Sequence, residues 1–564
     1  MRPTLSSGKL SVLALAAVLA AGCQRSEAPA PEQPTPAANA PSAQAFVPAI
    51  SSEDFARHVK TLASDEFEGR APGSHGERLT VDYIQGQFQR LGLKPGNGDS
   101  YVQTVPMVQT TADPSTVLHI RDAQGEYQLA YGTDMVIGTT SGQPEVSVAD
   151  SELVFIGYGV DAPEADWNDY AIDVAGKTVV VLVNDPGFHV GDEELFQGKR
   201  MTWYGRWVYK FEEAARKGAT GALIIHDTEG AGYGWDVVSN SWSGAQFDLP
   251  ASEDPAPRLP LQGWLSADDA SALFQRAGLD LDALRIAANQ RGFKPVPLNA
   301  RMSATLKSEI SSGQSDNVLA LLPGTSRPDE VVIYMGHWDH LGRNPELEGD
   351  QIYNGAIDNA TGIAGILEIA EMLVQQPPQR SVLFLAVTLE ESGLLGSKYY
   401  VARPSFPLAK TVGVINLDAL SVVGRTRDFT VIGHGNSELE DILRPIAERQ
   451  SRILRAESGL EKGFYYRSDH FNFAKAGVPA LYAGGGVDHF EKGEEYGLAM
   501  QAEYTRLRYH KPADEFDPNW DLRGVVEDLS ALYQVGRELA DGDQWPNWYE
   551  GNEFRAIRDA SRAE

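Results

Sequence analysis

The sequence predicts an α/β protein with a doubly wound, mostly parallel sheet and a smaller α/β domain inserted into it. Residues 300–540 alternate short apolar runs, such as VVIYMG and SVLFLAVT, with amphipathic segments of helical period. Residues 145–300 carry a second, shorter alternation of the same kind. Fully apolar runs are typical of strands that helices cover on both faces, and strand–helix–strand repetition is typical of parallel sheets.

The N-terminal residues resemble a bacterial secretory signal. Arg2 and Lys9 precede an apolar run over residues 10–21, which is too short to span a membrane as a stable helix. The run ends in LAAGC, which resembles a lipobox, and Cys23 is the only cysteine in the sequence. We therefore expect a signal peptide over residues 1–22 and a lipid anchor on Cys23. An ordinary cleaved signal followed by secretion is the alternative.

Composition indicates where the exported chain resides and what it does not bind. Gln24, and not an aspartate, follows the cysteine, which by the sorting pattern of lipoproteins indicates the outer membrane of a Gram-negative bacterium, facing the periplasm. Residues 23–50 are rich in Ala, Pro, Ser and Gln and are expected to form an extended tether. The formal net charge of −30 argues against nucleic acid and anionic lipid headgroups as partners.

Two separate stretches are expected to build the main domain. Residues 51–144 form its first part and open with two helices, SSEDFARHVKTLAS with a capping serine and ERLTVDYIQGQFQRLGL, which ends at Gly92 and Pro95. Residues 301–543 form its second part, in which the helix TGIAGILEIAEMLVQQ connects the first two strands. Residues 544–564 are expected to form a C-terminal tail.

The inserted domain is expected over residues 145–300. Its pattern is the strand GKTVVVLVND, the helix WVYKFEEAARKGA and the strand GALIIHD. The stretch GATGALIIHD resembles a protease-associated domain. We interpret the aromatic side chains of Trp203, Tyr204, Trp207 and Tyr209 as packing groups and not as a substrate site.

Acidic and imidazole side chains follow three consecutive predicted strands, at the edge where open α/β sheets gather their working residues. The residues at the three strand ends, together with one in the turn NGAIDNATG, are His337, Asp339, Glu390, Glu391, Asp418 and Asp358. Imidazole and carboxylate without thiolate suits Zn²⁺, with Mn²⁺ or Co²⁺ as alternatives, and a bridging carboxylate allows two ions. Two ions that share a water lower its pKa toward neutrality.

Six segments together resemble peptidase family M28, which contains zinc aminopeptidases and carboxypeptidases. The segments are GHWDHLG, NGAIDNATGIAG, TLEESGLLGS, NLDAL, RSDHFNFAKAGVPAL and YHKPADEFD. The likeness covers residues 51–140, where EFEGRAPGSHGE contributes, and residues 300–540. Each segment alone is a weak signal, whereas their order and spacing together are specific.

The resemblance implies two Zn²⁺ ions held by five side chains. His337 and Asp418 are expected to bind one ion, and Glu391 and His510 are expected to bind the other. Asp358 is expected to bridge the two ions. The resemblance also implies a cis peptide bond directly after this bridging aspartate.

Further residues receive roles from the same resemblance. Glu390 is expected to be the general base, since a neighbouring glutamate that binds a metal loses basicity. Asp339 is expected to orient the first histidine ligand, and Asp469 and His470 match a supporting pair of the family motif. Tyr465 is the candidate for stabilising the oxyanion.

The function expected from the sequence is that of an exported zinc exopeptidase acting on peptides, as an aminopeptidase that releases N-terminal residues with a metal-bridging water and a glutamate base. A carboxypeptidase or dipeptidase of the same family, or a noncatalytic receptor-like protein of the same fold, are the alternatives. A metallo-β-lactamase-type site is disfavoured because Met335 stands where that motif needs a histidine. Ser392 and Ser468 have no convincing His/Asp partnership, which argues against a serine nucleophile. His340 is expected to pack or hydrogen-bond near the site. The sequence leaves the oligomeric state open.

Overall fold

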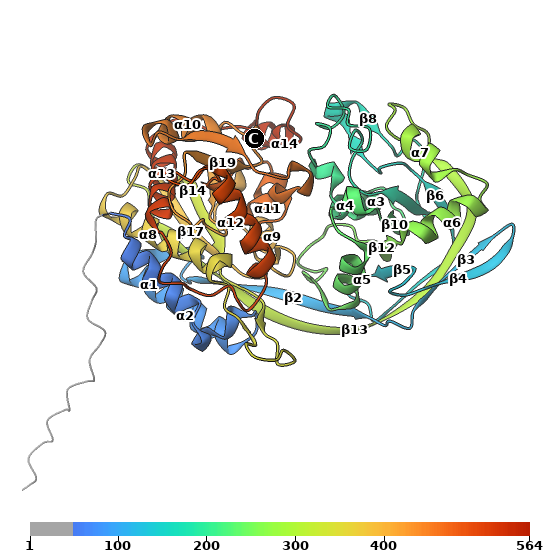
Figure 1. Cartoon of the computed structure of the whole chain (residues 1–564), viewed down its shortest axis with the longest axis horizontal. Helices are drawn as coiled ribbons and strands as arrows, with labels where there is room; N and C mark the ends of the chain where they lie inside the picture. The colour runs from blue at the N-terminus through green and yellow to red at the C-terminus, as the bar shows by residue number, and fades with distance from the viewer. Residues whose placement is uncertain (1–48, 564) are drawn as a thin grey trace, which may run out of the picture. The chain divides into compact units, whose positions relative to one another are not determined.

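The computed structural model describes residues 49–563 (Figure 1). The expected signal peptide, the lipid-anchor residue Cys23 and nearly all of the tether lie outside these residues and stay predictions. Within the described part of the chain, no helix combines the length and the apolar character needed to cross a membrane.

The first sheet confirms the predicted α/β class. Its four central strands, β17, β14, β18 and β21, run parallel to one another, and antiparallel strands flank them on both sides. The strands are, in spatial order, β11 (Gln246–Asp248), β2 (Val102–Ala112), β13 (Val296–Leu322), β17 (Arg380–Val387), β14 (Arg327–His337), β18 (Thr411–Asn416), β21 (Ala480–Gly485), β19 (Asp428–Ile432) and β20 (Ile453–Ala456).

Helices cover both faces of this sheet, which explains why its strands are apolar at every position. In β14, Val332 and Tyr334 join one buried cluster, whereas Val331, Ile333 and Met335 join another. The helices that pack on the first face are α1 (Ser52–Leu62), α2 (His75–Arg90), α8 (Thr361–Gln375), α10 (Leu439–Arg449) and α13 (Arg523–Asp541). The helices on the second face are α9 (Leu395–Ala402) and α11 (His470–Lys475).

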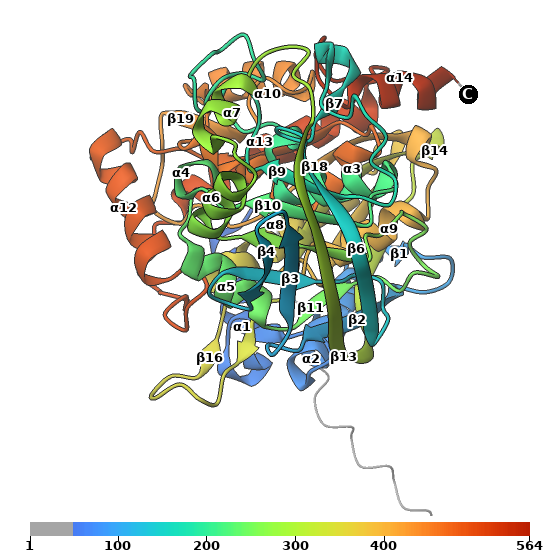
Figure 2. The same cartoon turned by 90° about the vertical axis from the view of Figure 1, so that its right-hand side faces the viewer.

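A second sheet shares β13 with the first. Residues 296–307 of β13 pair with β6 and β3, and residues 308–322 pair with β2 and β17 of the first sheet; Figure 2 shows β13 between β3 and β6. The second sheet is, in spatial order, β4 (Gly125–Ala130), β3 (Val117–Asp122), β13, β6 (Glu145–Phe155), β9 (Thr178–Leu182), β10 (Gly221–Ile225), β12 (Leu261–Leu265) and β5 (Met135–Gly138).

The start expected for the inserted domain, residue 145, falls inside this second sheet, at the first residue of β6. Strands β3, β4 and β5 come earlier in the chain and belong to the same sheet. The sequence did not reveal this arrangement, because the polar middle of β13 alternates like a surface strand and gives no sign that one strand serves two sheets. The likeness to a protease-associated domain stays a prediction.

The second sheet's segment 200–206 contacts the part of the chain that follows β20. The ring of Trp203 lies 4.7 Å from the ring of Phe471, measured between centroids, and Met201 N–H donates to Leu460 O at 3.2 Å. Trp203, Tyr204 and Tyr209 are buried and contact one another edge to face, so the predicted packing role of these aromatic rings is confirmed.

We expect the substitution Trp203→Ala to lower the free energy of unfolding by about 3–5 kcal/mol, because it removes a buried ring that its surroundings cannot replace. Denaturant unfolding monitored by circular dichroism measures this loss. Val237→Ala is the control, since the Val237 side chain is 47% exposed and its loss should change stability by no more than about 0.5 kcal/mol. Equal stability of the two variants would contradict the packing role of Trp203.

Candidate metal centre

Five predicted ligands converge at the carboxyl ends of the parallel strands. His337 ends β14, and its Nε2 lies 3.2 Å from Asp358 Oδ1 and 3.4 Å from Asp418 Oδ1. His510 Nε2 lies 3.2 Å from Asp358 Oδ2 and 3.1 Å from Glu391 Oε2. The two oxygens of Asp358 therefore face two separate groups of ligand atoms.

The chemistry of this donor set fits two zinc ions. It consists of three carboxylates and two imidazoles without a thiolate, which suits Zn²⁺. Burial lowers the pKa of both imidazoles, but the surrounding carboxylates outweigh it: the pKa of His337 lies well above its usual value and that of His510 rises to about 10. The cluster thus attracts positive charge, which a pair of divalent cations supplies.

His340 lies beside the second group of ligands, as the sequence predicts. Its Nδ1 is 2.7 Å from Glu391 Oε1. One nitrogen of His340, one oxygen of Asp358 and one of Glu391 all lie within 4.8 Å of one another. His340 therefore orients Glu391 and is also close enough to serve as a further ligand.

Asn359 connects the strand ends that carry the ligands. The peptide bond between Asp358 and Asn359 is cis, which confirms the expectation from the resemblance. The Asn359 side chain donates to Leu417 O at 3.0 Å and to His337 O at 3.3 Å, and it accepts from Gly362 N–H at 2.9 Å. A Cβ atom on Gly362 would lie 2.3 Å from Leu417 O, so only glycine fits this approach between β18 and α8.

Asp514 holds the turn that carries the bridging aspartate. Its carboxylate accepts hydrogen bonds from Ile357 N–H at 3.2 Å and from Asp358 N–H at 3.1 Å, and its carbonyl oxygen accepts one from Ala356 N–H at 2.9 Å. Sequence reasoning missed this role. The available signal was the position of Asp514 in YHKPADEFD, four residues after the ligand His510.

Arg70, from the segment EFEGRAPGSHGE, also binds the backbone next to the predicted ligands His337 and Asp358. It is buried, and it donates to backbone carbonyls only: to Trp338 O at 2.8 Å, Leu62 O at 2.9 Å, Asn354 O at 2.6 Å and Gly355 O at 2.8 Å. Trp338 directly follows the predicted ligand His337. Asn354 and Gly355 lie just before Asp358 in the chain. The segment EFEGRAPGSHGE is part of the resemblance to family M28, but its sequence indicates no role for Arg70.

The two remaining acids lie beside the ligands. Glu390 is half-buried, and burial, with the negative charge of Glu391, raises its pKa well above the usual value. Glu390 N–H donates to Asp339 Oδ1 at 3.2 Å. The predicted orientation of His337 by Asp339 takes a different form, because His337 Nδ1 lies 3.1 Å from the Asp339 carbonyl oxygen and 3.8 Å from its carboxylate.

The ring of Tyr465 packs against residues that are not predicted ligands, and its oxyanion role stays a prediction. Its side chain is 3% exposed and packs against the rings of His470, at 4.6 Å, and Tyr466, at 5.4 Å between centroids. Neither of these residues is a predicted ligand. The position of Tyr465 four residues before Asp469 did not reveal where its ring points, because the turn between them decides the direction.

Two other tyrosines contact the ligands directly. Tyr482 donates from its hydroxyl to Asp418 O at 3.2 Å, and Tyr509 stacks on the imidazole of His510 with 3.9 Å between centroids. Sequence reasoning did not single out either tyrosine. Adjacency to His510 was the one available signal for Tyr509.

The segment RSDH supports the centre through hydrogen bonds. Ser468 Oγ donates to Asp418 Oδ2 at 2.6 Å and so orients this ligand. Asp469 accepts from Ser397 Oγ at 2.6 Å, and His470 Nδ1 lies 3.4 Å from Asn416 Nδ2. The predicted supporting pair is thus part of a buried polar network that ends at the ligands.

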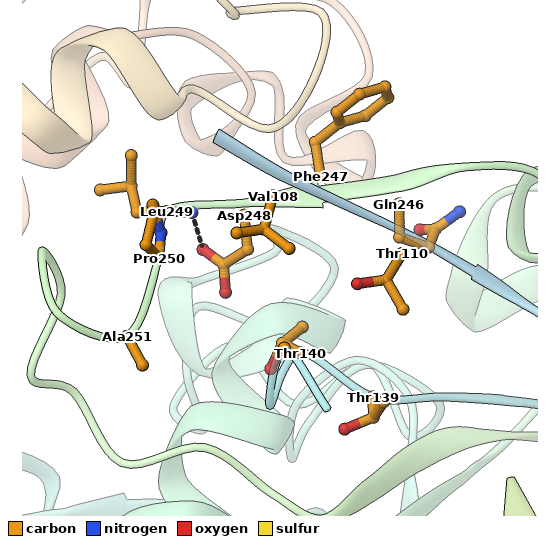
Figure 3. A pocket seen from close by; sticks show the side chains of 11 residues that line it. Val108, Thr110, Thr139, Thr140, Gln246, Phe247, Asp248, Leu249, Pro250 and Ala251 are labelled. Atoms are coloured by element: carbon orange, nitrogen blue, oxygen red, sulfur yellow. Dashed lines mark hydrogen bonds between the residues drawn. The ribbon is translucent and has the colours of Figure 1, made fainter. Parts of the chain in front are cut away.

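A separate shallow pocket lies between β2, β11 and the residues that follow β5 (Figure 3). Thr110, Thr140 and Asp248 are among the residues that line it. None of the lining residues is a ligand or a neighbour of one in sequence. The chemistry therefore belongs to the strand ends and not to this pocket.

An α/β sheet that gathers imidazole and carboxylate groups at the carboxyl ends of its parallel strands is the arrangement of a metal-binding α/β protein. Residues 317–533 match the model of Peptidase family M28. This stretch is therefore similar to the M28 peptidases, and the resemblance found in the sequence is confirmed there.

Curated relatives with zinc metalloprotease or aminopeptidase names, and one solved structure, are similar to parts of the chain. The chain is 25% identical over 240 residues to a probable zinc metalloprotease of Pyrenophora tritici-repentis, covering 40% of this chain and 51% of that protein. It is 26% identical over 384 residues to probable leucine aminopeptidase 2 of Aspergillus fumigatus, covering 64% and 67%. An aminopeptidase structure from an Aneurinibacillus species is 20% identical, with a TM-score of 0.45 and coverage of 88% and 95%. The chain spans about half the length of the probable zinc metalloproteases it matches.

We expect Arg70→Met to lower the free energy of unfolding by roughly 3 kcal/mol or more, because four buried carbonyls lose their donor. We also expect the bound zinc to fall, because three of these carbonyls, those of Trp338, Asn354 and Gly355, belong to the segments beside the ligands. Denaturant unfolding and metal analysis of the purified variant measure the two effects. Arg78→Met, at an exposed position of α2, is the control; a similar loss in that variant would remove the special role of Arg70.

Proposed function

We propose that the protein is a zinc-dependent exopeptidase and, more specifically, an aminopeptidase that hydrolyses the N-terminal peptide bond of its substrates. The observation that carries this proposal is the position of Asp358, whose two oxygens face His337 on one side and His510 on the other. Such an arrangement suits a pair of ions that act on one substrate carbonyl. The activities named for the relatives support the aminopeptidase direction.

Two zinc ions in this centre would supply Lewis acidity for the scissile carbonyl and a water of lowered pKa. The protein's own residues perform the remaining work. Glu390 takes the proton of the attacking water at its carboxylate and delivers it to the leaving amine. Its raised pKa suits this exchange, because the carboxyl group can hold the proton between the two steps. Glu391 cannot share the task while it binds a metal.

Other side chains keep the ligands in position. His340 orients Glu391, Ser468 orients Asp418, and the Asp514 carboxylate fixes the backbone at Asp358. Holding the ligands in this way lets the centre form without rearrangement when substrate binds.

The substitution Glu390→Gln tests the general base. We expect it to keep the fold and two zinc ions but to lower kcat by about 100-fold or more, because glutamine cannot accept the proton. Peptide hydrolysis, circular dichroism and metal analysis together check this outcome. Glu495→Gln, on the exposed surface of α12 (Glu494–Leu507), is the matched control and should retain full activity. Comparable turnover in the Glu390 variant would refute the role.

The direction of cleavage requires a panel of peptides. We expect N-acetylation to abolish hydrolysis and C-terminal amidation to leave the N-terminal bond cleavable, because an aminopeptidase needs the free amine. A chelator should abolish hydrolysis of every substrate, and added Zn²⁺ should restore it. Unchanged cleavage of the acetylated peptides would show that the aminopeptidase assignment is wrong, and activity that persists after removal of the metal would exclude the zinc mechanism.

A further inference from the structure

The middle of β13 has one unpaired edge. Its residues 308–318 pair with β2 on one side. On the other side β6 pairs with residues 296–307 and β17 pairs with residues 318–322, and no strand of the described chain pairs with the stretch between them. The antiparallel pairing places Val318 opposite Ala386, close to the end of β17. The unpaired stretch of β13 therefore extends past the carboxyl end of β17.

Hydrogen bonds where β6 begins show which backbone groups face the unpaired edge. Lys307 O accepts from Asp113 N–H, just after β2, at 2.9 Å. Ser308 N–H instead donates to Pro144 O, just before β6, at 2.9 Å. Successive residues of an antiparallel strand direct their N–H and C=O groups to opposite edges. The even-numbered residues of this stretch therefore face the unpaired edge, and the odd-numbered residues face β2.

Three of these even-numbered residues offer free backbone groups. The N–H and C=O groups of Ile310, Ser312 and Gln314 make no hydrogen bond to any residue in the described part of the chain. Residues 311–314 are exposed. The sequence ISSGQ, over residues 310–314, contains neither a proline nor a charged side chain, which are features that keep other chains away from strand edges. The edge is therefore open to a further strand.

One end of the unpaired edge lies beside the metal centre. Asp316 O accepts a hydrogen bond from Trp338 Nε1–H at 2.9 Å, and Trp338 directly follows the predicted ligand His337. β17 ends next to the same end of the edge and leads on to Glu390 and Glu391. A chain that pairs with the edge from this end thus starts next to the groups that would hold zinc.

We propose that a peptide substrate binds as an added strand along residues 310–314 of β13, with its N-terminus at the metal centre. β17 and β6 both run antiparallel to β13 on this edge. A peptide of the same direction fills the gap between them and has its N-terminus next to the end of β17. Main-chain hydrogen bonds hold it whatever its side chains are. The inference rests on the proposed aminopeptidase function and adds a binding mode for longer peptides to it.

Backbone methylation of the substrate tests this mode of binding. Residues 310–314 span about 14 Å, which five extended peptide residues cover, so the hexapeptide Leu-Ala-Gln-Ala-Gln-Ala reaches the whole edge. We expect a single N-methyl group to raise KM by about 3- to 10-fold at every second residue from the third to the sixth, because only alternate N–H groups face β13. Equal effects at neighbouring residues, or no effect at any of them, would overturn the proposal.

The variant Ser312→Pro assigns these contacts to β13. Proline removes the one N–H that residue 312 directs to the unpaired edge and leaves the hydrogen bonds to β2 in place. We expect kcat/KM for the hexapeptide to fall by about 10-fold through KM, and kcat/KM for the dipeptide Leu-Ala to fall less, because the dipeptide is too short to span the edge. An equal loss for both substrates would contradict the added strand.

A neighbouring residue supplies the control. Ser311→Ala changes an exposed side chain whose backbone groups face β2, and this variant should behave as wild type with both substrates. Circular dichroism and zinc content establish that each variant folds. If the proline variant does not fold, the methylation series on the wild-type protein decides alone.

Binding measured without turnover separates this proposal from the peptidase function. Calorimetric titration of the methylated hexapeptides into zinc-loaded Glu390→Gln protein reports their affinities directly. Affinities that alternate along the peptide, without hydrolysis by the wild-type protein, would support the added strand and reject the peptidase. Hydrolysis without alternation would reject the added strand alone. A dimer in sedimentation analysis that Ser312→Pro dissociates would assign the edge to a second copy of the chain and overturn the proposal.

Discussion

Carboxylates gathered at one edge of a parallel sheet repel one another, and the rest of the structure has to hold them in place against this repulsion. Asp358 lies 3.2 Å from both His337 and His510, Asp418 lies 3.4 Å from His337, and Glu391 lies 3.1 Å from His510. Glu390 lies beside them. Such crowding destabilises the folded chain unless cations neutralise it. A cation bound there would therefore stabilise the folded domain, and the surrounding backbone has to resist the repulsion among the carboxylates.

That resistance comes from hydrogen bonds to backbone groups. Asp514 accepts a hydrogen bond from the amide of Asp358, and the Asn359 side chain donates one to the Leu417 carbonyl. Arg70 binds four carbonyls, three of them on the segments next to the ligands. Arg70 also brings a buried positive charge: burial lowers its pKa to about 10, while Asp358 and Asp514 raise it. A neutral donor would satisfy the carbonyls but would not offset the acids.

The shared strand β13 links the metal centre to the second sheet. Its N-terminal half pairs with β6 and its C-terminal half with β2 and β17, the strand that leads to Glu390 and Glu391. A continuous strand is stiff compared with a loop, so the second sheet has a defined position beside the first. The segment 200–206 accordingly contacts the part of the chain that follows β20, through Met201 and Trp203.

The sequence by itself predicted the α/β class and a group of imidazole and carboxylate side chains at one edge of the sheet, because the ends of parallel strands meet there. The assignment of the five ligands, His510 among them, came from the resemblance to family M28. The sequence also determined the role expected of Glu390, through the adjacent Glu391. Only the tertiary structure decided which groups hold those ligands. Arg70 and Asp514 act on carbonyl and amide groups far away in the sequence, and the contacts of Tyr465 and the double pairing of β13 depend on packing, which leaves no periodic signal in the chain.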